Sequence, residues 1–249
     1  MITVDSLAKH FVDTKRGIVR AVDGVSFESQ PGEIFGLLGA NGAGKTTLMR
    51  MLSTVITPTY GSATIAGYDV VRDAAQVRRN IGFMSSTTAL YTRLTAKEMI
   101  AYMGRLYGLR GRDLDRRVAE VIQMLQIAEF QDRLCDKLST GQKQRVSLAR
   151  TILHDPPVLF FDEPTAGLDV LASRTIMEFI EERRATGKTV VFCTHIMSEA
   201  ERLCDRICVL HNGKVAAIGT LDELKQMTGE ERLEKVFLSL VSGQEADVA

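Results

Sequence analysis

The first third of the chain alternates apolar and polar residues in a pattern that predicts β-structure. Runs at 2–7 and 19–27 alternate, while 34–38 is continuously apolar, as expected for a strand buried on both faces. A glycine-rich loop and a helical stretch from Thr46 to Ser53 follow that buried run. Residues 61–70 predict a further strand and turn. This region therefore contains a strand–loop–helix unit, and we expect its other β-elements to form an N-terminal antiparallel region.

The middle of the chain changes to helical periodicity. From about 95 to 130, apolar residues recur every three or four positions in two segments separated by Gly108 and Gly111, and another amphipathic helix is expected from about 141 to 154. Apolar strands return at 158–162 and 189–194, with a helix near 170–185, a hairpin at 207–218 and a weak helix near the end. The alternation predicts an α/β fold with a mainly parallel sheet that binds its ligand at the strands' carboxyl ends.

We expect one domain spanning 1–249. Residues 1–87 and 157–225 would form its catalytic core, 88–156 an inserted helical subdomain, and 226–249 a C-terminal helix and tail. In that tail, Leu233, Val236, Phe237 and Leu240 could pack as one helix face against the core or against a second subunit. With 249 residues, 45% of them apolar, the chain can bury a sizeable core.

Composition limits the partners. Lys and Arg total 31 and Asp and Glu total 31, so the zero net charge provides no long-range attraction to nucleic acid or anionic lipid. The apolar runs are far shorter than a bilayer span, and the N-terminus lacks the apolar region of a signal peptide. We expect a soluble chain without a nucleic-acid partner, whose link to a membrane runs through another protein.

The four cysteines show no CxxC pair. Cys204 and Cys208 would share a face if their stretch were helical, but no second ligand pair accompanies them. Ordinary thiols in a reducing compartment are favoured over a metal site.

A phosphate-binding loop is the most specific motif. The segment fits G-x-x-x-x-G-K-[ST] at every position, between a buried strand and a helix. Its backbone N–H groups would cradle phosphate oxygens, Lys45 would contact the β- and γ-phosphates, and the Thr46 hydroxyl could bind Mg²⁺. The residues expected to bind ATP here are Gly39, Ala40, Asn41, Gly42, Ala43, Gly44, Lys45, Thr46 and Thr47.

Two consecutive acids end the apolar run 158–162. Asp162 could hold Mg²⁺ beside Thr46, while strand alternation would turn Glu163 elsewhere, free to deprotonate an attacking water. On its own, such a pair could equally be a solvated strand edge or a helix N-cap.

A second candidate anion site precedes the helix at 141–154. Ser139 and Gln142 have the S-x-x-Q spacing of a capping box, which needs no function. A serine hydroxyl with helix N-terminal N–H groups would also suit an anion. The spacing alone leaves both interpretations open.

Together the motifs resemble the nucleotide-binding domain of ABC transporters. The phosphate loop GANGAGKTT, the signature LSTGQKQR, the strand VLFFDEP, AGLD at 166–169 and a histidine after TVVFCT occur in the family's order, over about residues 2–220. The resemblance implies a P-loop NTPase (RecA-like) core, ATP as substrate and Mg²⁺ as cofactor.

The resemblance also implies roles for further residues. Two copies, or a pseudo-dimer, would enclose two ATP molecules, each contacted in trans by Ser139, Gly141 and Gln142. Alongside Glu163 and Lys45, His195 would be catalytic, as the switch histidine that contacts the γ-phosphate. Asp169 would lie at the dimer interface, and Phe11 would stack on adenine.

One position departs from the family pattern. After the strand ending at 81–84 the family has Pro-Gln, where this chain has Ser85-Ser86. The family's glutamine contacts Mg²⁺ and the attacking water. Ser86 is a candidate Mg²⁺ ligand in its place, although its side chain is too short to reach equally far. Because Lys45 and Glu163 are retained, we expect hydrolysis to survive.

The stretch SSTTALYTRLTAKEM resembles ATP-binding subunits of sodium-efflux and related ABC-2 type exporters of drugs or polymers. In these, the integral membrane permease is a separate chain, which places the ATPase in the cytoplasm on the inner face of the cell membrane. The helical insert would be the lever that contacts the membrane helices, and the stretch 85–94 would be the docking site for the permease.

The alternatives are a soluble ABC-type ATPase acting on ribosomes or nucleic acid, and a non-hydrolysing ATP sensor. ATPases of the first kind carry a second such domain, or a coiled-coil or zinc insertion, and this sequence shows neither. A sensor of the second kind would be expected to lack Glu163 or His195, and both are present.

Overall fold

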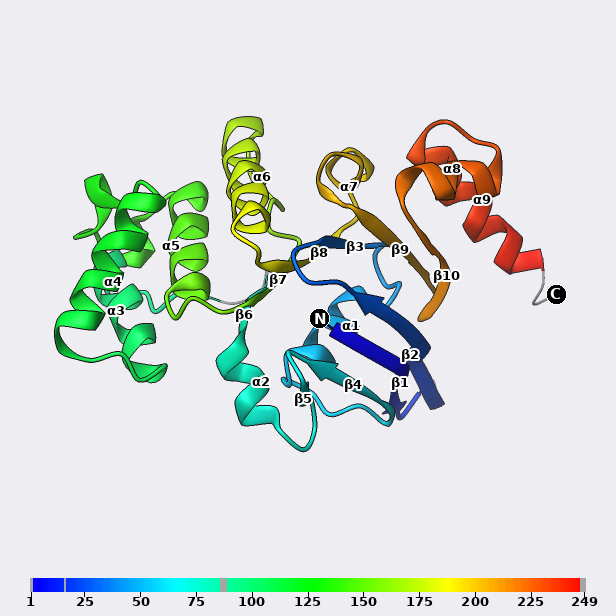
Figure 1. Ribbon diagram of the computed structural model, residues 1–249, viewed down its shortest axis with the longest axis horizontal. Helices are drawn as coiled ribbons and strands as arrows, with labels where there is room; N and C mark the ends of the chain where they lie inside the picture. The colour runs from blue at the N-terminus through cyan, green and yellow to red at the C-terminus, as the bar shows by residue number, and fades with distance from the viewer. Residues whose placement is uncertain (1, 16, 86–88, 247–249) are drawn as a thin grey trace.

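A six-stranded sheet forms the centre of the computed structural model, which describes residues 2–15, 17–85 and 89–246 (Figure 1). The strand order is β10-β9-β3-β8-β7-β6; every neighbouring pair is parallel except β10 with β9. The predicted α/β fold with a mainly parallel sheet is confirmed. Its strands are β3 (Ile34–Leu38), β6 (Ile81–Ser85), β7 (Val158–Asp162), β8 (Thr189–Thr194), β9 (Arg206–His211) and β10 (Lys214–Gly219).

The central strands are buried on both faces. Every residue of β3, β7 and β8 is buried, and successive side chains enter different apolar clusters, as for Phe160 and Phe161. Because these strands are parallel, their carboxyl ends meet at one edge of the sheet. The phosphate loop after β3 and the loops after β7 and β8 begin at that edge.

The predicted N-terminal antiparallel region is also confirmed. It forms a four-stranded sheet in the order β2-β1-β4-β5, below the central sheet in Figure 1. Helix α1, which starts in the phosphate loop, packs its Leu48 and Met49 into the cluster shared by both sheets. The elements are β1 (Ile2–Asp13), β2 (Gly17–Ser29), α1 (Lys45–Leu52), β4 (Tyr60–Ile65), β5 (Tyr68–Asp69) and α2 (Ala74–Asn80).

The stretch between β6 and β7 is helical and lies at one end of the molecule (Figure 1). Its apolar residues, among them Ile100 and Val121, continue into the cluster that contains Phe161 and Phe192 of the sheet. One helix ends at Leu106, before Gly108, and the next begins at Gly111, as expected. The elements are α3 (Ala96–Leu106), α4 (Gly111–Met124), the 3₁₀ turns Ala128–Phe130 and Cys135–Lys137, and α5 (Thr140–Ile152).

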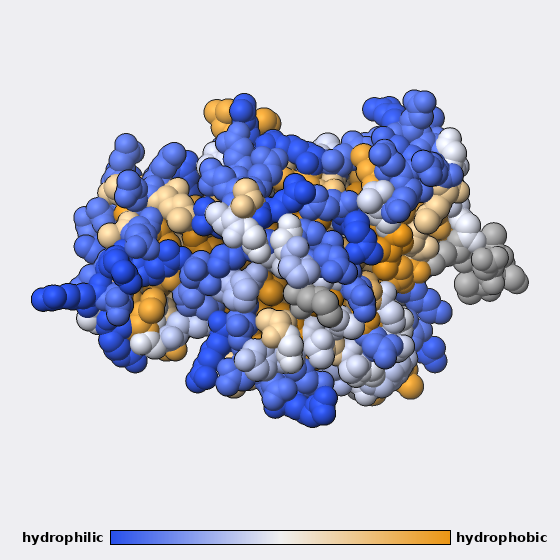
Figure 2. Space-filling view, in the orientation of Figure 1, coloured by the Kyte–Doolittle hydropathy of each residue, from blue (hydrophilic) through white to orange (hydrophobic). Residues whose placement is uncertain are grey.

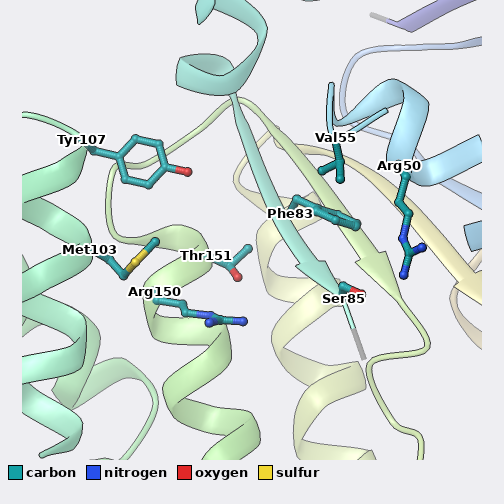
Figure 3. A pocket seen from close by; sticks show the side chains of 8 residues that line it. All are labelled: Arg50, Val55, Phe83, Ser85, Met103, Tyr107, Arg150 and Thr151. Atoms are coloured by element: carbon teal, nitrogen blue, oxygen red, sulfur yellow. The ribbon is translucent and has the colours of Figure 1, made fainter. Parts of the chain in front are cut away.

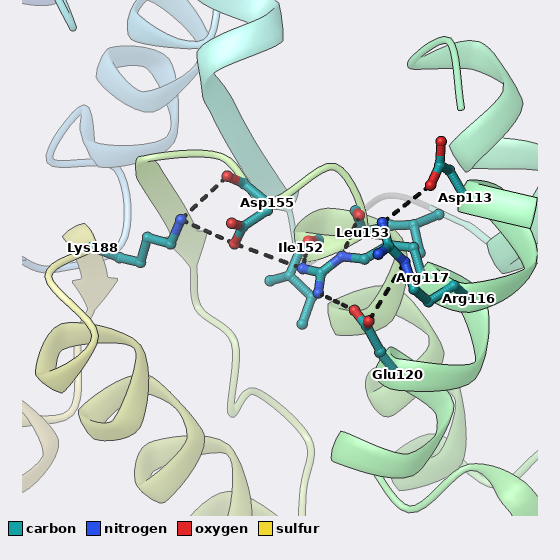
Figure 4. Close-up of polar contacts among 8 residues, drawn as sticks. All are labelled: Asp113, Arg116, Arg117, Glu120, Ile152, Leu153, Asp155 and Lys188. Atoms are coloured by element: carbon teal, nitrogen blue, oxygen red, sulfur yellow. Dashed lines mark hydrogen bonds and ion pairs between the residues drawn. The ribbon is translucent and has the colours of Figure 1, made fainter. Parts of the chain in front are cut away.

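Arg117 of α4 ties this helical insert to the sheet (Figure 4). Its guanidinium donates to the carbonyls of Leu153 (2.9 Å) and Ile152 (3.2 Å), which satisfies groups that the end of α5 leaves unpaired. It also lies 3.6 Å from Asp155, and Asp155 pairs at 2.9 Å with Lys188, just before β8. The insert is thus joined to the core where α5 leads into β7.

The last helix packs on the chain's own core. Leu233, Val236 and Phe237 are buried in a cluster with Leu38 and Val209 of the sheet. Of the two surfaces expected to cover this helix face, the core or a second subunit, the structure shows packing against the core. The elements here are α6 (Val170–Ala185), α7 (Met197–Leu203), α8 (Leu221–Thr228) and α9 (Leu233–Ala246).

Cys204 and Cys208 do not share a helix face, because Cys204 ends α7 and Cys208 lies in β9. Burial raises the pKa of the Cys208 thiol to about 12. Across 2–15, 17–85 and 89–246, no group of three or more His, Cys, Asp or Glu residues could hold a metal.

The face in Figure 2 is mostly hydrophilic, with smaller hydrophobic groups, one of them at the upper end of the region where Figure 1 has α6. Val170 and Leu171, at the start of α6, are 84% and 77% exposed. Within the described residues, no helix is both long enough and apolar enough to cross a membrane.

Candidate functional site

The phosphate loop lies between β3 and α1, and its glycines are required by backbone contacts. A Cβ at Gly39 would lie 2.5 Å from the carbonyl oxygen of Leu210, and one at Gly44 would lie 2.4 Å from that of Ala21. Gly44 also has φ +105°, which side-chain-bearing residues rarely adopt. The motif's glycines are therefore needed for packing as well as for an approaching phosphate.

A cavity of about 310 Å³ opens over this loop. Lys45 is buried beside it; its Nζ donates to the carbonyls of Gly39 (2.7 Å) and Ala40 (3.2 Å). The ammonium is thus held at the loop's centre. The cavity is lined by Ala21, Ala40, Asn41, Gly42, Ala43, Gly44, Lys45, Thr46, Thr47 and Glu163.

Asp162 faces the start of α1. Thr46 Oγ1 donates to its Oδ1 at 3.3 Å, while its Oδ2 is buried without a hydrogen-bond partner among the described residues. Burial is the main cause that raises the pKa of this carboxyl, and the hydrogen bond from Thr46 opposes it. An unpaired buried carboxylate oxygen costs free energy, which a bound cation would offset.

Glu163 points elsewhere, but strand alternation is not the reason. Strand β7 ends at Asp162, and Glu163 has a left-handed φ of +53°, held by its N–H donating to the carbonyl of Cys193 at 2.9 Å. This strained turn brings Glu163 Oε1 to 3.6 Å from Lys45 Nζ. The expectation that the two acids separate holds, through a turn that the sequence pattern did not indicate.

His195 completes the group. It follows β8 directly, and its Nδ1 donates to Glu163 Oε2 at 2.8 Å. The ring is 46% exposed, whereas Glu163 is only 14% exposed. The structure therefore brings Lys45, Thr46, Asp162, Glu163 and His195 together from three loops of one sheet edge.

The signature residues lie apart, at the start of α5. Ser139 is exposed and caps the helix: its Oγ accepts from the N–H of Gln142 at 3.3 Å, and the Gln142 side chain accepts from the N–H of Ser139 at 3.0 Å. Gly141 is half-buried. Both bonds of the capping box are thus present, and they leave the helix start open to solvent.

Asp169 and Phe11, the other two predicted site residues, both lie at the surface. Asp169 is exposed and caps α6 by accepting from the N–H of Ala172 at 2.9 Å. Phe11, in β1, is 42% exposed, and Lys9 Nζ lies 5.4 Å from its ring centroid. Ser86 lies outside the described residues.

Sequence reasoning missed two parts of the site. Ala21 of β2 lines the cavity, and the N–H of Gly213, in the β9–β10 turn, donates to the carbonyl of Ala43 at 3.0 Å. Both act through backbone contacts, which leave no recognisable residue type in the sequence.

A second cavity, of about 340 Å³, lies between α1 and the helical insert (Figure 3). Arg50 and Val55 line one side, and Met103, Tyr107 and Arg150 the other. Arg150, mostly buried, donates to the carbonyl of Ala89 at 3.4 Å, so this cavity adjoins the stretch 85–94. Its remaining lining residues are Phe83, Ser85 and Thr151.

Comparison with known proteins identifies the family. Residues 22–166 match the family described as ABC transporter, and the chain is 39% identical to the ABC transporter ATP-binding protein NatA of Bacillus subtilis over 98% of this chain and 99% of NatA. The chain belongs to the ABC transporter family. As an ATP-binding subunit of that family it hydrolyses ATP to drive transport, and the ribosome or nucleic-acid alternative is not favoured.

Two further similarities concern activity and assembly. This ABC subunit is 40% identical to the Nod factor export ATP-binding protein I of Rhizobium meliloti, over 80% of this chain and 59% of that protein. A dimeric post-hydrolysis structure of the ATP-binding cassette MJ0796 bound to ADP and Pi superposes with a TM-score of 0.80 and 27% identity, covering 88% of this chain and 98% of that one.

Proposed function

We propose that this subunit is the cytoplasmic motor of an exporter: two copies close over Mg-ATP on the inner face of the cell membrane and drive a permease on a separate chain. The observation that carries this proposal is the meeting of Lys45, Glu163 and His195 over the phosphate loop. A phosphate-binding cation and a residue that positions or deprotonates the attacking water recur in enzymes that transfer or hydrolyse phosphoryl groups.

Glu163 is the general base in this proposal. His195 holds one carboxylate oxygen, so the other, near Lys45, is directed at the cavity where a water attacking the γ-phosphate would lie. Lys45 would move its hydrogen bonds from the loop carbonyls to phosphate oxygens when nucleotide binds.

Thr46 and Asp162 would hold Mg²⁺. The donor set fits, because a buried and unpartnered carboxylate oxygen beside a hydroxyl matches the oxygen ligands that Mg²⁺ prefers. Bound Mg²⁺ would neutralise charge on the phosphates. A contribution from Ser86 remains a prediction; its neighbour Ser85 is buried and pairs in register with Asp162.

The dimer is supported by exposed residues at the starts of α5 and α6. Ser139 and Asp169 are exposed, and Val170 and Leu171 present large apolar side chains next to Asp169. The dimeric state of MJ0796 gives a precedent for two cassettes pairing. A nucleotide held by Ser139, Gly141 and Gln142 of one copy and the phosphate loop of the other binds the closed state better, so ATP favours closure and its hydrolysis favours opening.

The 340 Å³ cavity is the docking site that we propose for the permease. Arg50 and Arg150 give it positive charge, while Val55, Met103 and Phe83 give it an apolar floor. A short amphipathic segment with an acidic residue would match both features. Because the cavity is lined from α1 and from the helical insert, movement of the insert would change its shape.

Export is supported by the likeness to the Nod factor export protein. The cargo, whether sodium ions, a drug or a polymer, would be chosen by the permease. Phe11 would stack on adenine; its exposed ring supports a role outside the core.

Co-purification from detergent-solubilised source membranes tests the proposal. The tagged Glu163→Gln variant with Mg-ATP should capture a stoichiometric multi-span protein, and the additional Val55→Asp change should release it without changing Mg-ATP binding. Capture of ribosomes or DNA in its place would contradict the transporter role.

A further inference from the structure

The part of β1 just before Phe11 has interrupted pairing with both of its neighbours. Its register with β2 shifts between Leu7 and Lys9 and again between Lys9 and His10, and its register with β4 shifts between Asp5 and Ala8. Such bulges turn side chains away from the regular pleat. Phe11 follows these shifts: it pairs regularly with Val19 of β2, whereas the pairing of β1 with β4 ends at Ala8.

Contacts with the segment before β4 hold this stretch on one side. Lys9 Nζ, which lies over the Phe11 ring, donates to the carbonyl of Thr57 at 2.7 Å. The His10 N–H donates to Thr59 Oγ1 at 3.0 Å, and the Thr59 N–H donates to the carbonyl of Ala8 at 2.7 Å. Ala8, Lys9 and His10 are thus all hydrogen-bonded to the segment 57–59.

The His10 side chain joins a cluster centred on Asp23. Tyr60 donates its hydroxyl to Asp23 Oδ1 at 2.9 Å, His10 Nε2 lies 3.3 Å from the same oxygen, and the two rings pack edge to face with centroids 5.2 Å apart. Asp23 is 14% exposed and is also approached by Arg20 (3.5 Å) and Lys214 (3.9 Å). The Tyr60 hydrogen bond is the largest cause that lowers the pKa of Asp23. The carboxylate is therefore ionised and fully engaged.

Asp23 is also linked to the phosphate loop, through backbone hydrogen bonds. The N–H of Asp23 donates to the carbonyl of Gly213 at 2.8 Å, and the N–H of Gly213 donates to the carbonyl of Ala43. A continuous set of bonds thus runs from Phe11's neighbour His10, through Asp23, to the loop that binds phosphate.

We propose that Tyr60 and Asp23 are positioning residues for base recognition: they fix the Phe11 ring relative to the phosphate loop, so that it contacts the base of a nucleotide whose phosphates are bound. This inference rests on the adenine-stacking part of the proposed function. Neither residue needs to touch the nucleotide. Their effect is to remove conformational freedom that stacking would otherwise have to overcome.

The test compares two ligands that share the phosphate site but differ in having a base. Affinities for Mg-ATP and for inorganic tripolyphosphate with Mg²⁺ are measured by calorimetry in the Glu163→Gln background. Tyr60→Phe keeps the ring and removes the hydroxyl, and we expect it to weaken Mg-ATP binding about three- to tenfold, a cost in the range of one ordinary hydrogen bond. Tripolyphosphate affinity should change less than about twofold, within the additivity error of distant sites. Tyr68→Phe, an equally conservative change in the same sheet, should alter neither.

A double-variant cycle with Phe11→Ala decides whether Tyr60 acts through Phe11. Phe11→Ala should weaken Mg-ATP binding about tenfold, as expected for loss of one stacked aromatic. Adding Tyr60→Phe to it should have no further effect. Equal losses for ATP and tripolyphosphate, or additive losses in the cycle, would overturn the positioning role. An unchanged Mg-ATP affinity in Phe11→Ala would instead refute the stacking platform itself. His10→Phe, which keeps the ring contact, repeats the test if Tyr60→Phe does not fold.

Discussion

Glu163 and His195 are joined by a 2.8 Å hydrogen bond although they are 32 residues apart and follow different strands. The bond forms because β7 and β8 are adjacent and parallel, with Asp162 in register with Cys193. One carboxylate oxygen is thereby occupied, and the other remains near Lys45. In the mechanism that we propose, Glu163 therefore abstracts the proton and His195 holds the Glu163 carboxylate in place.

Replacing the histidine should therefore separate chemistry from binding. His195→Ala leaves Glu163 and the phosphate loop in place but frees the carboxylate to rotate. We expect the turnover rate to fall about a hundredfold, within the range for a positioned acid or base. The Mg-ATP dissociation constant should stay within about threefold, a change of less than 1 kcal/mol. Steady-state kinetics and calorimetry measure the two quantities, and a parallel loss of both would contradict the role given to His195.

The two interpretations of Ser139 can be separated by a matched pair of variants. Asn and Asp are both good N-caps, so Ser139→Asn and Ser139→Asp should each keep the melting temperature within about 3 °C of the wild-type value. Only Asp adds a negative charge where the partner's γ-phosphate would lie. ATP-dependent dimerisation of the Glu163→Gln protein, measured by light scattering, should be lost with Asp and largely retained with Asn. Equal dimerisation by both would leave Ser139 with its capping role alone.

Asp162 should destabilise the nucleotide-free protein at neutral pH. Burial raises the pKa of its carboxyl above the unfolded value, so its ionised form is penalised in the folded state. Asp162→Asn should therefore raise the thermal midpoint at pH 7, by an amount that shrinks as pH falls toward the ordinary Asp range. It should also abolish the additional stabilisation that Mg²⁺ gives to bound ATP. Differential scanning calorimetry with and without Mg-ATP checks both effects; a lower midpoint at pH 7 would contradict the first.

His154 predicts the opposite pH dependence. Its Nε2 donates to the carbonyl of Ile81 at 2.9 Å, and its ring stacks on Tyr107 with centroids 3.6 Å apart. Burial lowers its pKa from 6.5 to about 4. The unfolded chain thus binds a proton first, and stability is lost as pH falls from about 6.5 towards 4, by at most about 3 kcal/mol.

His154→Phe keeps the ring stack but cannot be protonated. Its free energy of unfolding should be lower at pH 7, because the Ile81 bond is lost, yet it should decline less between pH 7 and 5 than that of the wild type. Urea titrations at each pH measure the difference. Identical slopes in both proteins would rule out His154 as the source.

The sequence predicted the sheet because its central strands are buried on both faces, which leaves continuous apolar runs such as 158–161. It did not predict α2, α7 or α8. These helices have seven or eight residues each, too few for a clear apolar period. Lys45, Asp162 and Glu163 were predictable because phosphate and metal chemistry restricts residue type. The left-handed turn at Glu163 and the backbone contacts of Ala21 and Gly213 were not, since tertiary packing sets them.

The most direct test of the central claim is the steady-state rate of Mg-ATP hydrolysis by the purified wild-type protein beside Glu163→Gln. The arrangement of Lys45, Glu163 and His195 predicts a wild-type rate at least about a hundredfold higher, the minimum contribution of a general base, with both proteins binding Mg-ATP. Equal rates in two folded, ATP-binding proteins would contradict hydrolysis at this site.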